Sequence, residues 1–416
     1  MELLNNMGSR AKIVSRLLAV VGPARKNDAL LSMADTLEAQ SAAILAANRQ
    51  DVEAARAAGM SPSMVDRLSL SEERIHAMSD GIRQVAALTD PVGEVVEGYR
   101  RPNGLRIQKL RVPLGVIGII YEARPNVTAD AAALCLKAGN AVILRGGKEA
   151  IRSNMAIVAA LRQGVHAMGI PSDSIQLVED TSRETAQQLM RMNDYIDVLI
   201  PRGGAGLIRS VVQNATVPVI QTGVGNCHIY VDERANIAMA RDIVVNAKTS
   251  RPSVCNAAET LLVHAAIAQE ALPEIAAALR EKKVRLRCCA RAAEILRGFP
   301  VEAASQEDWS TEYLDYVLAI RVVDSLNEAI AHIATYSTGH SECIVTDSQS
   351  AADRFTASVD AAAVYVNAST RFTDGGEFGM GAEIGISTQK LHARGPMGLR
   401  ELTSFKYVVY GNGQIR

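Results

Sequence analysis

The sequence predicts an α/β protein built on a doubly wound parallel sheet, with a second α/β domain and a small additional arm. Short apolar runs alternate with amphipathic helical stretches between residues 115 and 220, and a second stretch of this kind covers about 230–365. Runs that are apolar throughout are typical of strands buried on both faces, and helices between them imply right-handed βαβ crossovers. At 416 residues the chain is too long for one core, so we expect two or three domains.

The first hundred residues are expected to form a helical layer. Segments such as Ala29–Glu38 and Glu73–Ile82 have apolar residues at helical spacing. Residues 105–112 then alternate apolar and polar side chains, which predicts a half-exposed strand.

The next hundred residues should supply the strands and helices of the first sheet. The expected strands are Gly115–Tyr121, Ala141–Leu144, Ile175–Val178, Ile196–Ile200 and Val217–Ile220, with helices near 127–138, 150–168, 183–192 and 205–214. A last apolar run, 403–410, has no partner nearby in the sequence. Because an unpaired terminal strand is a liability, we expect it to pair with 105–112 and to help form an oligomer contact.

The composition is that of an ordinary soluble globular protein. Hydrophobic residues make up 48%, charged residues 21%, and the net charge is −1, so there is no basic surplus to hold a nucleic acid. No apolar stretch reaches the length of a membrane span, and the N-terminus lacks the apolar core of a signal peptide. Six scattered cysteines predict neither a disulfide framework nor a zinc site. We therefore expect a cytoplasmic protein with reduced thiols and no metal site.

Cys255 is the candidate nucleophile. It lies in Arg251–Glu259, a short segment just ahead of an apolar, strand-like run. Pro252 interrupts the preceding helical pattern, and Asn256 and Glu259 make the segment too polar for a core element. A buried cysteine is ordinarily only a small packing residue, whereas a turn that offers backbone N–H groups favours the reactive thiolate.

Asn126 is the candidate oxyanion donor. It opens a helix at the carboxyl end of the first sheet strand, where ligands of open α/β sheets bind. A polar residue at such a position is most often part of the helix cap. Its functional interpretation is an amide that donates to an oxygen gaining negative charge.

Three glycine-rich turns form the predicted cofactor site. They contain Arg145, Gly146, Gly147 and Lys148 in the first, Arg202, Gly203 and Gly204 in the second, and Gly223 in the third. Glycines let the backbone approach a ligand, the basic side chains could neutralise a phosphate, and a helix that starts at the second turn could hold a pyrophosphate. Each turn alone could be an ordinary tight turn, but we expect all three at one edge of one sheet.

Two later segments are candidate parts of the same site. Glu312 lies in Trp309–Tyr316, which is either a solvated face or a source of a ribose-hydroxyl acceptor. Residues 371–386 are glycine-dense and too polar for a core element, which predicts an active-site loop. The histidines considered, including His340 in a polar turn, never fall at the spacing of a metal-binding helix.

In this order, these motifs resemble the aldehyde dehydrogenase superfamily. The strings 113–128, 251–260 and 381–399 are similar to one branch of it, the enzymes that reduce γ-glutamyl phosphate in proline biosynthesis. The resemblance covers essentially the whole chain. It implies a division into three parts: a cofactor domain of residues 1–100 and 114–230 with part of 366–392, a catalytic domain of 231–365, and an oligomerisation arm of 101–113 and 393–416.

The resemblance also implies an activity. NADPH would reduce L-glutamyl 5-phosphate to L-glutamate 5-semialdehyde through a cysteine thioester, with release of phosphate. Cys255 would be the nucleophile, Asn126 and the backbone N–H of Cys255 would form the oxyanion hole, and Glu312 would bind the nicotinamide ribose. The resemblance implies a homo-oligomer acting on a small molecule, and it leaves open whether glutamate 5-kinase hands over the acyl phosphate.

Two departures from related enzymes bear on specificity. Lys148 stands where many NAD-using relatives carry an acid, and a cation there suits the 2′-phosphate of NADP. Residues 221–226 contain no carboxylate, whereas relatives that hydrolyse their thioester carry a glutamate there. This counts against a hydrolytic semialdehyde dehydrogenase. A non-catalytic protein on the same fold is the other alternative, and the complete set of Asn126, Cys255 and Glu312 counts against it.

The residues that hold the amino and carboxylate groups of the substrate are less evident. Charge and position in loops suggest Arg124, His392 and Arg394.

Overall fold

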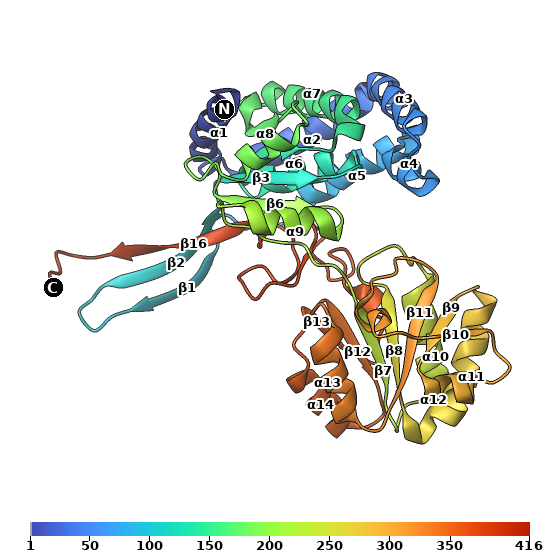
Figure 1. The fold of residues 1–416 in the computed structure, drawn as a ribbon. Helices are drawn as coiled ribbons and strands as arrows, with labels where there is room; N and C mark the ends of the chain where they lie inside the picture. Colours follow the sequence, from blue (N-terminus) through green and yellow to red (C-terminus); the bar gives the residue numbers. More distant parts are fainter. Residues whose placement is uncertain (1) are drawn as a thin grey trace. The chain divides into compact units, whose positions relative to one another are not determined.

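The computed structural model describes residues 2–416 and shows two compact units (Figure 1). The first consists of the residues up to Thr222 with Gly379–Gly385 and Met397–Arg416, and the second of Gly223–Phe378 and Ile386–Pro396. The sequence suggests a division at residue 230, whereas Gly223 already belongs to the second unit. The reason is that strand β7 (Cys227–Val231) pairs with β8 (Ala258–His264) and β12 (Ser341–Val345) of that unit.

The first unit contains a parallel sheet of four strands in the order β5-β4-β3-β6. These strands are Ile175–Leu177 (β5), Ala141–Arg145 (β4), Val116–Tyr121 (β3) and Val198–Arg202 (β6). Every residue of β3 is buried, as expected for a strand covered on both faces.

The prediction of a fifth strand in this sheet, at Val217–Ile220, is wrong. This segment makes only an isolated bridge between Val219 and Leu199, with hydrogen bonds from Leu199 N–H to the Pro218 carbonyl and from Ile220 N–H to the Leu199 carbonyl. Pro218 has no N–H to donate, so it cannot extend the ladder.

Helices form the layers around this sheet, as the periodicity predicts. They are Glu2–Leu18 (α1), Pro23–Ala39 (α2), Ser41–Ala57 (α3), Pro62–Leu68 (α4), Glu72–Ala87 (α5), Asn126–Lys137 (α6), Ile151–Ala167 (α7), Arg183–Leu189 (α8) and Ala205–Asn214 (α9). Helix α2 packs against α5 and α7 and buries Leu30, Met33 and Leu37 on one face. A Cβ at Gly164 of α7 would lie 2.6 Å from the Met33 Cα, so the close approach of these helices requires glycine there.

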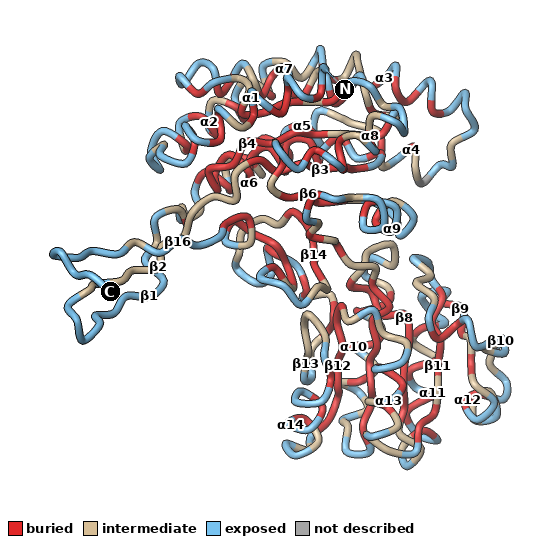
Figure 2. Tube along the Cα trace, turned by 60° about the vertical axis from the view of Figure 1, so that its left-hand side comes forward, coloured by how far each residue is buried: buried red, intermediate tan, exposed pale blue. Residues whose placement is uncertain are grey.

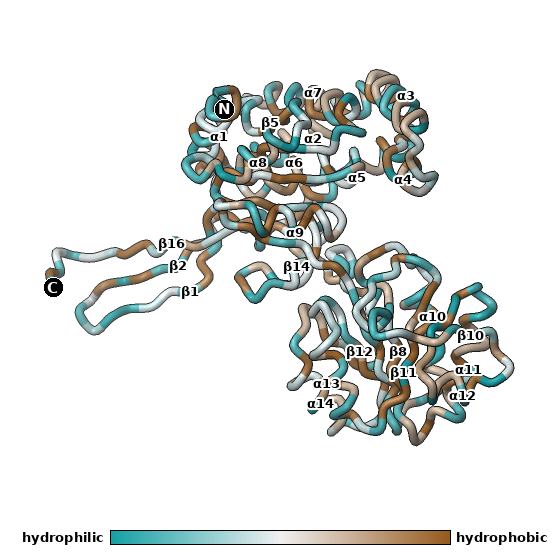
Figure 3. Tube along the Cα trace, viewed as in Figure 1, coloured by the Kyte–Doolittle hydropathy of each residue, from teal (hydrophilic) through white to brown (hydrophobic). Residues whose placement is uncertain are grey.

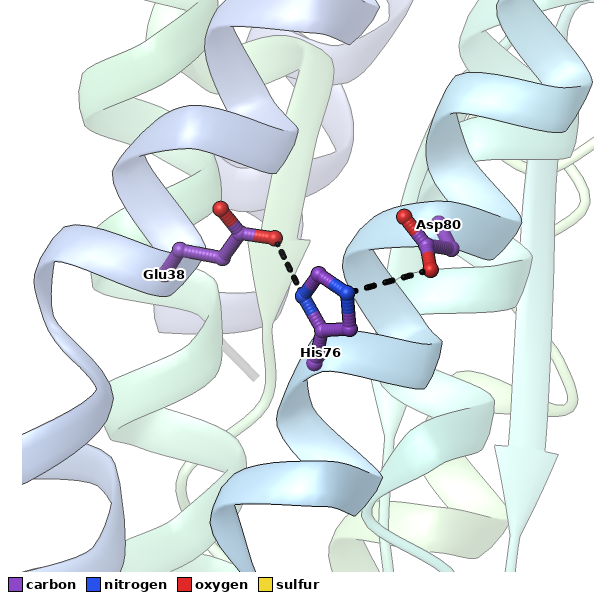
Figure 4. A group of neighbouring side chains, drawn as sticks. All are labelled: Glu38, His76 and Asp80. Atoms are coloured by element: carbon purple, nitrogen blue, oxygen red, sulfur yellow. Dashed lines mark hydrogen bonds and ion pairs between the residues drawn. The ribbon is translucent and has the colours of Figure 1, made fainter.

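A group of ionisable side chains lies between α2 and α5 (Figure 4). His76 contacts Glu38 at 3.0 Å and Asp80 at 3.4 Å, a spacing that a cation could also use. Arg83, however, donates to both carboxylates. Because the group is largely exposed and already neutralised by arginine, we interpret it as a surface ion-pair network between two helices.

Three antiparallel strands form an arm in the order β1-β2-β16. They are Val95–Arg100, Arg106–Pro113 and Thr403–Tyr410, and the pairing of the last two confirms the expectation for the C-terminal run. Strand β1 was not expected, because its six exposed residues carry no apolar period. The turn signal Pro102-Asn103-Gly104 that follows it could have indicated a hairpin. Lys109 lies over the Phe405 ring at 4.5 Å, so cations shield part of the exposed apolar surface.

The second unit is built on a parallel sheet of seven strands in the order β10-β9-β11-β8-β7-β12-β13. The remaining strands are Arg285–Cys288 (β9), Val301–Ala303 (β10), Val317–Val323 (β11) and Ala363–Val366 (β13). Alternate residues face opposite sides. Leu261 packs against the layer of α10 (Ile237–Thr249), α11 (Ala265–Glu281) and α12 (Ala290–Ile295), whereas Leu262 packs against α13 (Leu326–Tyr336) and α14 (Gln349–Ser358). Figure 2 shows the central strands as buried, and Figure 3 shows hydrophobic residues along them.

The candidate residues Cys255 and Glu312 lie near the amino ends of strands of this unit, and so do Gly225 and His340. Gly225 precedes β7, Cys255 precedes β8, Glu312 precedes β11 and His340 precedes β12. Because these strands are parallel neighbours, the four turns meet at one edge of the sheet. Among the helices of residues 2–416, none combines the length and apolar character needed to cross a bilayer.

Candidate active site

The turn that carries Cys255 is fixed through its backbone. Helix α10 ends at Thr249, as Pro252 predicts, and the Cys255 side chain is partly exposed. The Cys255 carbonyl accepts a hydrogen bond from the buried Cys227 thiol at 3.2 Å. On the same carbonyl lies Gly225, where an added Cβ would stand 1.4 Å from the oxygen. The backbone of Cys255 is therefore closely packed, and the residue is partly exposed.

Replacing Gly225 by alanine should disrupt this arrangement. Because the methyl group would overlap the Cys255 backbone, we expect a loss of stability of about 1–3 kcal/mol together with loss of activity. The free energy of unfolding in urea and the turnover rate test this. The control is Gly98→Ala in β1, where the nearest atoms lie at an ordinary 3.8 Å and both quantities should be little changed. A stable, fully active Gly225→Ala protein would contradict the geometry.

Glu312 is tied to the same glycine. Its Oε1 accepts the Gly225 N–H at 2.7 Å. Burial raises the pKa of Glu312, and the Gly225 N–H and the Lys248 charge oppose this shift. Gly225 thus joins the turn of Cys255 to the Glu312 carboxylate. Its place in the glycine-rich turn 221–226 does not by itself indicate this role.

A buried ion pair stabilises the turn that carries Glu312. Lys248 of α10 lies 2.5 Å from Glu259 of β8, and both side chains are fully buried. The other Glu259 oxygen accepts the N–H of Leu314, a non-glycine residue with φ of 54°. Burial raises the pKa of Glu259 to about 7, and Lys248 counteracts this shift. The expectation that Glu259 marks a polar, non-core segment is therefore wrong, because ion pairing allows the carboxylate to be buried.

Asn256 is also buried, because its polar atoms find partners in the loop expected near the active site. Its Nδ2 donates to the carbonyls of Arg371 and Thr373, and its backbone carbonyl accepts the Thr370 hydroxyl at 2.7 Å. The short helix η4 (Thr370–Phe372) is thereby fastened beside Cys255.

Gly223 lies in the second unit, beside Thr388 and the His340 ring. The expectation that all three glycine turns share one edge of one sheet is met only at the start of the third turn, where the Thr222 hydroxyl donates to the Pro201 carbonyl of β6. Sequence could not show this, because the segment at 217–220 that seemed to belong to the first sheet leads directly into the second unit. Burial lowers the pKa of His340 to about 4, so this histidine is neutral at pH 7.

Asn126 is the first residue of α6 in the first unit, as expected for a helix start. Its exposed amide donates from Nδ2 to the Asp130 carboxylate at 3.1 Å. Burial raises the pKa of Asp130 to about 6, so the carboxylate is ionised at neutral pH. Because a carboxylate only accepts hydrogen bonds, Asp130 orients the amide with its NH₂ group toward itself, which leaves a second N–H to donate.

The first glycine turn has two kinds of basic side chain. Arg145 donates to the carbonyls of Thr181 and Ser182 and so anchors the loop after β5. Lys148 is exposed, and within residues 2–416 its ammonium has no hydrogen bond or ion pair. Of the two, Lys148 is the cation available to an external phosphate.

Gly146 of this turn is required from the protein side as well. A Cβ there would lie 2.2 Å from Nδ2 of the buried Asn154. Asn154 Oδ1 accepts the Thr128 hydroxyl, which also bonds to the Tyr121 hydroxyl at 2.6 Å. The glycine therefore packs against a buried polar network.

The second glycine turn begins α9 as predicted, but a carboxylate already lies at the helix start. Glu122 accepts the Gly204 N–H at 2.8 Å, and it also lies against Gly203. An anion at a helix N-terminus is stabilised by the helix dipole. Glu122 thus occupies the position that the sequence suggests for a pyrophosphate. A cofactor could use this N–H only if Glu122 moved.

The three substrate candidates differ in their surroundings. Arg394 is paired with Asp360 at 2.6 Å, which leaves it little freedom to bind a second carboxylate. Arg124 and His392 are exposed. Arg124 belongs to the first unit and His392 to the second.

Three features together define a class of protein. The chain has two parallel sheets covered by helices, a cysteine in the turn before a strand of the second sheet, and an arm of three antiparallel strands. Residues 11–288 match the aldehyde dehydrogenase family, and the chain belongs to that family. It is accordingly an oxidoreductase with this fold.

Its relatives are more specific. The chain is 62% identical to the gamma-glutamyl phosphate reductase of Moorella thermoacetica over 409 residues, which cover 98% of this chain and 97% of the relative. The crystal structure of gamma-glutamyl phosphate reductase from Thermotoga maritima is 51% identical and superimposes with a TM-score of 0.97 over 99% of both chains. The Saccharomyces cerevisiae protein of the same name is 30% identical, with a TM-score of 0.54 over 99% of this chain and 98% of that one.

Proposed function

We propose that the protein reduces L-glutamyl 5-phosphate to L-glutamate 5-semialdehyde with NADPH, releasing phosphate, as a step of proline biosynthesis. The observation that carries this proposal is full-length similarity to gamma-glutamyl phosphate reductases, at 62% identity to the Moorella relative. The fixed turn of Cys255 supports it, because a positioned, partly exposed thiol suits attack on an acyl phosphate.

The steps can be assigned to residues of the chain. The Cys255 thiolate attacks the acyl carbon, and the C–O bond to the phosphate breaks. Inorganic phosphate departs, and a thioester remains on Cys255. NADPH, when bound, would supply a hydride for reduction of the thioester on Cys255. The C–S bond of the resulting thiohemiacetal then breaks, giving the aldehyde and regenerating Cys255. At each tetrahedral stage Asn126 would donate its second N–H to the oxygen that gains negative charge.

Two residues fit a nicotinamide cofactor as they stand, whereas Glu122 would have to leave the Gly204 N–H for a pyrophosphate to bind there. With the oxygen that Gly225 does not use, Glu312 can accept hydrogen bonds from the hydroxyls of a ribose. Lys148 supplies an available ammonium for the 2′-phosphate that distinguishes NADP from NAD. The fit of Arg145 is weaker, because its guanidinium already donates to two carbonyls.

Cofactor preference gives a direct test. With acyl phosphate generated in place from glutamate, ATP and a glutamate 5-kinase, NADPH should be consumed much faster than NADH. In Lys148→Glu, one charge-assisted hydrogen bond to a phosphate is lost and a repulsion is gained. This should cost roughly 2–3 kcal/mol and lower the NADPH preference by about 30- to 150-fold.

The control is Lys282→Glu, an exposed lysine of the second unit, which should keep the wild-type preference. Equal catalytic efficiency with the two cofactors in the unmodified protein would refute the NADPH assignment. Failure to reduce the acyl phosphate with either cofactor would refute the function itself.

Self-association through the arm is part of the proposal. Strands β1 and β16 are the edges of the three-stranded sheet, and side chains such as Val95, Tyr407 and Val409 are exposed on it. Unpaired edges and exposed apolar side chains favour association with another chain. A direct transfer of the acyl phosphate from a glutamate 5-kinase would be a property separate from this self-association.

A further inference from the structure

Arg371 lies against the turn of the nucleophile in the second unit. Its Nη1 donates to Oδ1 of Asn256, and its Nε donates to the Ser250 hydroxyl at 3.0 Å. Ser250 and Asn256 flank residues 251–255, the stretch that ends at Cys255. The guanidinium is therefore fixed across this segment, and it is only partly exposed.

A second cation belongs to the same segment. Arg251 is exposed and lies close enough to disfavour the charge of Arg371. Burial first, and then the Arg251 charge, lower the pKa of Arg371. The charges of Asp374, the thiolate form of Cys255 and Glu377 act in the opposite direction. Two like charges side by side are unfavourable, and an anion bound between them would relieve the repulsion.

We propose that Arg371, assisted by Arg251, binds the α-carboxylate of the substrate and so holds its acyl group at Cys255. This inference rests on the proposed function and extends it to substrate recognition. A guanidinium offers paired N–H donors in a plane that match the two oxygens of a carboxylate. Arg371 also fits this role better than Arg394. Its Nε and Nη1 donate to neutral oxygens, whereas the guanidinium of Arg394 is paired with the carboxylate of Asp360.

The substrate contains two anionic groups, so the test must separate the carboxylate from the phosphate. In the reverse direction, Arg371→Met should raise KM for glutamate 5-semialdehyde by about 10- to 100-fold, because hydrogen bonds to a charged group are lost. KM for inorganic phosphate should change much less. Arg371→Lys keeps the charge but loses the paired donors. Its KM for glutamate 5-semialdehyde should therefore lie between that of the wild-type protein and that of Arg371→Met. A larger rise in KM for phosphate than for the aldehyde would assign Arg371 to the phosphate and overturn the proposal.

Alkylation of Cys255 gives a second readout that needs no reductase activity. Maleimidopropionate carries a carboxylate several bonds from its reactive carbon, and N-ethylmaleimide is a neutral reagent of similar size. The rate ratio of the two should fall about 10-fold in Arg371→Met and partly recover in Arg371→Lys. The control is Arg291→Met, in which an arginine of α12 that is paired with Asp324 is removed. This variant should keep the wild-type ratio.

The two readouts separate the possible failures. If the alkylation ratio falls but no acyl phosphate is reduced, the anion site stands and the proposed function does not. If reduction occurs and neither KM for the aldehyde nor the alkylation ratio depends on Arg371, the arginine only fastens η4 and the inference is wrong. Slower alkylation by both reagents to the same extent would likewise indicate a purely structural role.

Discussion

Replacing Cys255 by alanine should lower the turnover rate on the order of 10⁴-fold or more, because no thioester can then form. Cofactor binding should survive, since no part of the proposed nucleotide contacts uses the thiol. The measurements are steady-state NADPH oxidation with the acyl phosphate and fluorescence titration of bound NADPH. Loss of turnover with unchanged NADPH affinity would place the defect in the chemical step.

The matched controls are Cys135, Cys288 and Cys343, which are fully buried thiols. Burial raises the pKa of each of them, to about 12 for Cys288 and Cys343, so they are protonated at neutral pH and poor nucleophiles. Alanine at these positions should leave turnover largely intact. A Cys255→Ala protein with a sizeable fraction of wild-type activity would show that the thioester mechanism is wrong.

In reverse, oxidation of glutamate 5-semialdehyde should depend on inorganic phosphate as the acyl acceptor. General-base assistance to water is typically worth about 10²–10⁴-fold in rate, so phosphate omission should reduce turnover by a factor of this order. Residues 221–226 contain no carboxylate to act as that base. The structure adds that Glu312 accepts the Gly225 N–H and that Glu259 is paired with Lys248, so two nearby carboxylates have other partners.

The measurement is NADPH formation in a phosphate-free buffer with and without added phosphate, and arsenate serves as an alternative acceptor. Rapid turnover without either anion would mean that water attacks the thioester. The hydrolytic dehydrogenase alternative would then displace the reductase.

Much of the fold follows from the sequence, because it depends on local patterns. The buried strands β3 and β4 appear as uninterrupted apolar runs, and β5 and β6 appear as runs that are mostly apolar. Helices α6, α7 and α9 appear at their expected positions. The pairing of 403–410 with 105–112 also follows, since a terminal strand needs a partner. Strand β1 and the segment 217–220 were misjudged, because one has no apolar period and the other contains a proline within an apolar run.

The sequence by itself also determined where the chemistry would be sought. A cysteine in a polar turn, an asparagine at a helix start and a glycine turn with Lys148 are local signals, and the structure keeps each in the expected kind of element. Their resemblance to a known family then determined the activity to propose. Such signals depend on neighbours in the chain, so they can be recognised before the fold is known.

Only the tertiary structure decided which partners these residues have. Glu122 at the Gly204 N–H, Gly225 against the Cys255 carbonyl, and the Lys248–Glu259 pair each join residues that are separated along the chain. Whether a carboxylate is solvated, buried with a lysine or bound to a backbone N–H depends on which distant segment folds against it. The charge of a side chain alone does not determine its environment, because the free energy of burying the charge depends on the partner that the fold supplies.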